Sequence, residues 1–151
     1  MAEVFFYHLQ RQPLEAVLPR LLERTRARGW RALVKASSPE RLAALDDYLW
    51  SFADESFLAH GSDREADPQE QPILLTLGDE NRNGADALFL VERAGVPADI
   101  SGYARVMYLL DGSDEGAIAD GRDAYRAWRN AGHDLSYWQQ DEAGGWSKRG
   151  T

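Results

Sequence analysis

Three arginines in the last long helical segment form the clearest chemical pattern of the sequence. Arg122, Arg126 and Arg129 are spaced at i, i+4 and i+7, which places them on one face of a helix. A guanidinium group is a planar fork of donors that matches a carboxylate. The pattern fits capture of an acidic peptide, and it also fits a solvated helix face on which Asp123 is an ion-pair partner. The spacing alone favours the solvated face.

Carboxylates and a histidine elsewhere suggest other chemistry. Asp79 and Glu80 follow an apolar run and could hold Mg²⁺ through their oxygens, although we favour a solvated loop. His60 could act as an acid or base, although we favour a hydrogen bond to a loop carbonyl. The sequence contains no nucleophile elbow, dinucleotide fingerprint or phosphate-binding loop. We therefore predict no catalytic residue, no cofactor and no metal site.

Two aromatic residues flank the expected end of the second helix. Trp50 ends that helix and Phe57 opens the longest expected loop, residues 53–71. Large aromatic side chains at a helix end beside a loop are frequent interface anchors. They are also frequent core residues, and composition alone favours the core.

The composition of the chain limits the classes of partner that it can bind. The chain has 151 residues, a net charge of −8 and no cysteine. This acidity argues against a general nucleic-acid coat, although a local basic patch remains compatible with it. The N-terminus lacks the pattern of a secretory signal, and the apolar runs are far shorter than the ~20 residues that span a bilayer. We expect a soluble, cytoplasmic protein without a membrane contact.

The elements that must position these residues alternate between strands and helices. Apolar runs predict strands at residues 3–9, 31–36, 72–77, 86–92, 105–111, 133–140 and 146–149. Helices are predicted from Pro13 to Gly29, from a capping box at Ser37 and Glu40 onward, and over residues 114–132. Residues 93–102 are expected to form a loop with one helical turn. This order predicts a single α/β domain over residues 1–151, with a Rossmann-like open, mostly parallel sheet flanked by helices.

Several segments, taken together in order and spacing, resemble a known family. They are residues 4–9 (VFFYHL), 29–34 (GWRALV), 45–50 (LDDYLW), 56–61 (SFLAHG), 71–76 (QPILLT), 124–128 (AYRAW) and 131–132 (AG). The series is similar to the chi subunit of the bacterial DNA polymerase III holoenzyme over nearly the whole chain. The resemblance implies a single α/β domain that looks like a nucleotide-binding protein and is not an enzyme.

The resemblance also implies partners and binding residues. Chi proteins bind the acidic C-terminal tail of single-stranded DNA-binding protein (SSB), and contact DNA only indirectly. They also bind the psi subunit, which links them to the clamp loader, and in some bacteria a helicase competes for that surface. The tail-binding arginine of the family falls on Arg122 and a neighbouring cation on Arg126, while the psi-facing aromatics fall on Trp50 and Phe57. We expect Tyr125 to form part of the wall that receives the end of the tail, and Arg129 to extend the site.

Three departures from the family pattern stand out. Ala59 occupies a position where proline is frequent, and Ile118 one where some members carry lysine, so one candidate cation is absent. The segment from Trp138 to Trp146 exceeds the shortest members and has no assigned function, although Lys148 and Arg149 could add positive charge. Two alternatives stay open. One is a small nucleotide- or metal-dependent enzyme that uses Asp79 and Glu80, and the other is direct binding of single-stranded DNA through the arginines and aromatics.

Overall fold

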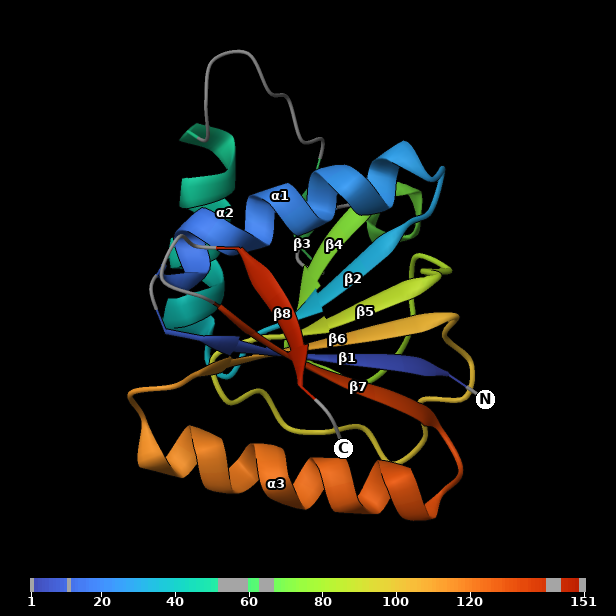
Figure 1. The fold of residues 1–151 in the computed structure, drawn as a ribbon. Coiled ribbons are helices and arrows are strands. Elements are labelled where there is room, and N and C mark those ends of the chain that lie inside the picture. Colours follow the sequence, from blue (N-terminus) through green and yellow to red (C-terminus); the bar gives the residue numbers. More distant parts are fainter. Residues whose placement is uncertain (1, 11, 52–59, 63–66, 141–144, 150–151) are drawn as a thin grey trace.

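An eight-stranded sheet forms the centre of the molecule (Figure 1). The computed structural model describes residues 2–10, 12–51, 60–62, 67–140 and 145–149. The strands are β1 (Glu3–Leu9), β2 (Ala32–Lys35), β3 (Gly61–Ser62), β4 (Ile73–Thr76), β5 (Ala87–Leu90), β6 (Arg105–Asp111), β7 (Asp134–Gln140) and β8 (Trp146–Arg149). Their order across the sheet is β3-β4-β2-β5-β6-β1-β7-β8, and every pair is parallel except β7 with β8. The predicted mostly parallel α/β sheet is confirmed.

The first strand of the sequence lies inside the sheet. β1 pairs on one side with β6 and on the other with β7, so that Val4 is level with Val106 and Leu135. Strands buried on both faces are continuous apolar runs, which is why VFFYHL predicts this element well.

Helices cover both faces of the sheet. The helices α1 (Leu14–Ala27) and α2 (Pro39–Ser51) lie on one face and α3 (Glu115–Asn130) on the other (Figure 1). A single 3₁₀ turn, η1, spans Pro68–Glu70. The described chain is thus one three-layer domain, in which residues on α2 and residues on α3 face opposite sides of the molecule.

The helices begin close to the predicted residues, with one correction to a capping residue. The hydroxyl of Ser38, not of Ser37, accepts the backbone N–H of Arg41 at 3.2 Å. Because Pro39 is the first residue of α2, the capping position is the residue directly before it. α3 is capped by the Asp114 carboxylate, which accepts from Gly116 N at 2.9 Å.

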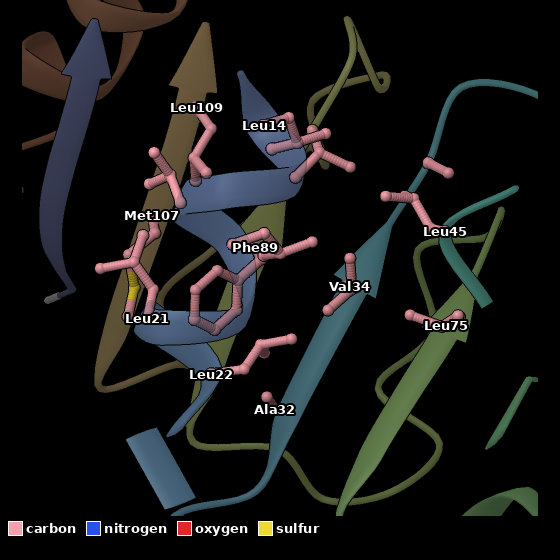
Figure 2. Close-up of a cluster of buried hydrophobic side chains, with 14 of the residues drawn as sticks. Leu14, Leu21, Leu22, Ala32, Val34, Leu45, Leu75, Phe89, Met107 and Leu109 are labelled. Carbon is pink, nitrogen blue, oxygen red and sulfur yellow. The ribbon is translucent and has the colours of Figure 1, made fainter. Parts of the chain in front are cut away.

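Two apolar clusters fill the space between the layers. On the α1 and α2 side, leucines of both helices pack on β2, β4, β5 and β6 around the fully buried Phe89 (Figure 2). On the α3 side, Phe6 and Trp128 pack with ring centroids 5.8 Å apart. Residues 91–104, which connect β5 to β6, add Ile100 and Tyr103 to this second cluster. They form turns without the expected helical turn and take the place of a helix on this face.

The expected loop over residues 53–71 contains one strand that the sequence did not predict. Gly61 and Ser62 pair in parallel with Leu74 and Leu75 of β4 and form an edge strand. A Gly-Ser pair carries neither apolar alternation nor β-branched side chains, so no sequence signal marks it.

Candidate functional site

The predicted arginine stripe of α3 lies on the solvent side. Ala117, Gly121, Ala124 and Trp128 form the buried side of the helix. A Cβ atom on Gly121 would lie 3.1 Å from Leu110 Cδ2, so the missing side chain permits the close approach to β6. Arg122, Arg126 and Arg129 are all exposed. No ion pair joins any of the three to a described residue, Asp123 included.

Apolar side chains border this stripe. Tyr125 and Ile118 are half-buried and belong to the edge of the cluster beneath α3. The Tyr125 ring packs on Phe6 with centroids 5.2 Å apart, so its position is fixed by the core. The helix therefore presents guanidinium groups directly beside a rigid apolar border, the combination that an acidic peptide with an apolar end requires.

Trp50, at the end of α2, is not a core residue. It is 54% exposed, whereas composition alone favoured burial. Phe57, the second predicted interface aromatic, and Ala59 lie outside the described residues.

His60 lies beneath Trp50 and has no exposed side-chain surface. Its Nε2 is 3.0 Å from Asp46 Oδ1 and 3.3 Å from the Asp46 carbonyl oxygen. The expected hydrogen-bonding role is therefore right, but the partner belongs to helix α2 instead of a loop. Sequence reasoning missed Asp46 as a partner, because a contact across 14 residues and a chain reversal leaves no local pattern.

Asp79 is engaged by a buried lysine. The Lys35 amine, on a side chain only 9% exposed, pairs with the Asp79 carboxylate and donates to the Gly95 carbonyl oxygen at 2.7 Å. Glu80 is exposed beside it. Within the described ranges, no group of three histidine or carboxylate side chains is arranged to hold a metal ion. Asp79 is thus the counter-ion of Lys35 in this structure.

A cavity of about 380 Å³ lies beyond the carboxyl ends of β1 and β6. β1 leads to α1 and β6 leads to α3, and these helices lie on opposite faces of the sheet. Open α/β sheets usually bind their ligands in the crevice between two such strands. Glu15, Glu92 and Asp111 contribute to its lining, and Arg41 pairs with Glu92 at 2.7 Å. Hydrogen bonds from Ser113 hold the pKa of the Asp111 carboxyl below its usual range, which keeps it negative. An acidic lining is the opposite of what a phosphate group needs.

Comparison with known proteins identifies the family. The family model described as "DNA polymerase III chi subunit, HolC" matches residues 1–136. The chain belongs to this family. The predicted resemblance is confirmed, and the family is that of an accessory subunit of DNA polymerase III, which acts in DNA replication. None of the described helices has the length and apolar character needed to cross a membrane.

Two curated chi relatives illustrate the similarity. A protein of Rickettsia prowazekii named "Probable DNA polymerase III subunit chi" is 24% identical over 106 residues, which are 70% of this chain and 62% of that protein. The "DNA polymerase III subunit chi" of Pseudomonas aeruginosa is 30% identical over 117 residues, 77% of this chain and 79% of that protein. The chain therefore spans less than two thirds of the length of the Rickettsia protein.

The chi family match includes all of α3 and ends inside β7. The stripe of Arg122, Arg126 and Arg129 thus lies within the matched part. Strand β8 lies beyond it, so the antiparallel β7–β8 hairpin completes the sheet with residues outside the match.

Proposed function

We propose that this chi-family protein is a two-sided adaptor of one domain over residues 1–151. In this proposal the α3 stripe holds the acidic C-terminal tail of SSB. The Trp50 region docks the psi subunit or another protein of the clamp loader, or a helicase. The observation that carries the proposal is a stripe of solvent-exposed, unpaired arginines on an otherwise acidic protein.

The tail site follows from charge and shape. Arg122 and Arg126 pair with carboxylates of the tail through charge-assisted hydrogen bonds, and Arg129 extends the positive stripe. Tyr125 and the neighbouring Ile118 offer the apolar border for the last side chain of the tail. Exposed ion pairs are screened by salt, so the affinity is moderate and the tail exchanges readily. The net charge of −8 disfavours binding of polyanions outside local clusters of cations.

The proposal of the second site depends on how Trp50 is held at the surface. An exposed indole fixed on a buried support has the properties of an interface anchor, because little side-chain freedom is lost on binding. The α2 end and α3 lie on opposite faces of the sheet, so the two partners do not compete for space (Figure 1). In this adaptor role the protein joins SSB-coated DNA to the replication machinery in the cytoplasm, and the α3 stripe reaches the DNA indirectly, through SSB.

The deciding experiment is the titration of a fluorescent SSB C-terminal peptide into the protein. We expect saturable, salt-sensitive binding that Arg122→Ala weakens at least tenfold. Arg20→Ala is the matched control, because Arg20 is an exposed arginine on α1, on the opposite face of the sheet. If the unmodified protein fails to bind the peptide at low salt, the tail-capture proposal is wrong.

A further inference from the structure

One part of the sheet face is only partly covered. On the α1 side of the sheet, around β6, β1 and β7, the aromatic side chains of Phe5, Trp30 and Trp138 remain half-buried. They come from β1, from the segment after α1 and from β7. Three elements far apart in the sequence thus bring planar side chains to one surface.

Arginines lie against these rings. The Arg105 Cζ atom lies 4.6 Å from the Phe5 ring centroid and 5.4 Å from that of Trp30. The Arg28 Cζ atom lies 5.0 Å from the Trp30 centroid. We call Phe5, Arg28, Trp30, Arg105, Trp138 and Lys148 the aromatic–arginine surface.

The local charge of this surface differs from that of the whole chain. Residues 20–31 contain five arginines and one glutamate, in a protein of net charge −8. Lys148 of β8 adds an exposed amine and is level with Trp138. Of the nearby carboxylates, Glu3 pairs with Arg105, whose Nη2 lies 2.7 Å from Glu3 Oε1, and Asp134, at the start of β7, lines the same cavity as Lys148.

The groups on the surface are held in place. Arg26 donates to the Trp30 carbonyl oxygen at 2.6 Å, and the Trp138 indole N–H donates to Ser136 Oγ at 3.0 Å. A cavity of about 130 Å³ is lined by Glu3, Phe5, Asp134, Ser136, Trp138 and Lys148.

We propose that the aromatic–arginine surface binds single-stranded nucleic acid. Partly exposed rings and guanidinium planes stack nucleobases, and the surrounding cations attract phosphates. An acidic peptide would satisfy the cations but would leave the planar groups without a matching partner, so the observations favour nucleic acid. This direct contact goes beyond the proposed adaptor role, and it lies on the face of the sheet opposite the α3 stripe.

The test measures fluorescence anisotropy of a labelled oligothymidine with the full chain at low salt and without SSB. The double variant Arg28→Glu/Lys148→Glu should bind at least tenfold more weakly. Loss of two phosphate contacts should also lower the slope of log affinity against log salt by about 1.4. The control is Arg122→Glu/Arg126→Glu, which changes the charge equally on α3. It should keep oligothymidine binding and lose binding of the SSB tail peptide.

Two further probes separate stacking from simple charge attraction. An abasic strand of the same length keeps the phosphates but lacks bases, so it should bind several-fold more weakly. Poly-glutamate of similar charge should compete poorly. The proposal is overturned if the unmodified protein does not bind oligothymidine, if both double variants weaken it equally, or if the abasic strand or poly-glutamate binds as tightly. Circular dichroism verifies that each variant is folded.

Discussion

The indole ring of Trp50 packs on the imidazole of His60, with ring centroids 4.2 Å apart. One ring is exposed and the other is buried, and the buried ring is held to Asp46 one helical turn before Trp50. The exposed anchor is therefore positioned by a side chain from outside its own helix.

The contact between the two rings predicts that His60 contributes to stability, whereas Trp50 contributes to partner binding. His60→Ala should lower the free energy of unfolding by about 1–3 kcal/mol, because a buried hydrogen-bonding group and its ring contact are lost. Trp50→Ala should cost little stability, since the side chain is 54% exposed. Urea unfolding of the two variants tests this, and equal costs would contradict it. In the proposed adaptor, Trp50→Ala should instead weaken the complex with psi.

Ile118 stands beside the arginine stripe, at a position where some chi proteins carry lysine, and a substitution can introduce this cation. Ile118→Lys places an amine one turn before Arg122 and should tighten binding of the SSB tail peptide several-fold at low salt. The gain should fade as salt rises, because exposed charges are screened. Removal of a half-buried apolar side chain should also cost about 1 kcal/mol of stability. Ile118→Gln removes the same apolar contact without adding charge, and equal affinity of the two variants would argue against a charge effect.

The pairing of Lys35 with Asp79 predicts a structural role for the acidic loop. Asp79→Asn should destabilise the fold by about 1–3 kcal/mol, because a largely buried amine loses its counter-ion. Glu80→Gln is the neighbouring control and should have little effect. Mg²⁺ should leave the melting temperature of the unmodified protein unchanged, since a ligand that binds only the native state must raise it. A rise that disappears in Asp79→Asn would show that Asp79 is a metal ligand.

Gly112 lies where the chain turns from β6 toward α3. The surrounding atoms leave no space there for a side chain. A Cβ atom there would meet the His8 ring and lie 2.9 Å from the Leu9 carbonyl oxygen. Gly112→Ala should therefore destabilise the protein by about 1–3 kcal/mol. Gly102→Ala serves as the comparison, because no atom lies within 4 Å of its added Cβ. Thermal unfolding that showed the same midpoint for both variants would refute the steric argument.

Tyr108 makes the fold sensitive to alkaline pH. Burial, with a smaller contribution from Asp120, raises the pKa of its phenol to about 12. Between the ordinary value of 10.0 and about 12, the folded state keeps a proton that the unfolded chain releases. This group therefore leaves stability unchanged below pH 10 and lowers it above pH 10, by about 1–2 kcal/mol. Tyr108→Phe should flatten this part of the stability–pH curve, as measured by urea unfolding.

The sequence predicts the local elements of this protein better than their arrangement. Apolar runs such as VFFYHL and the 3.6-residue period of α3 mark buried strands and an amphipathic helix, because each reflects which side of one element is buried. The strand order, the Lys35–Asp79 pair and the Asp46–His60 contact depend on residues brought together across many positions. The aromatic–arginine surface is a similar case, and its one sequence signal is the arginine-rich stretch over residues 20–31.

The position of β1 has a consequence for how the chain folds during synthesis. Its neighbours, β6 and β7, begin at Arg105 and Asp134, about a hundred residues or more later. β1, an apolar strand, therefore leaves the ribosome about a hundred residues before its first partner, β6, is made. Such non-local pairing slows folding and leaves hydrophobic surface exposed to aggregation in the meantime. Loss of β7 would leave β1 at an edge of the sheet, so both sides of β1 are paired only once β7 has been made.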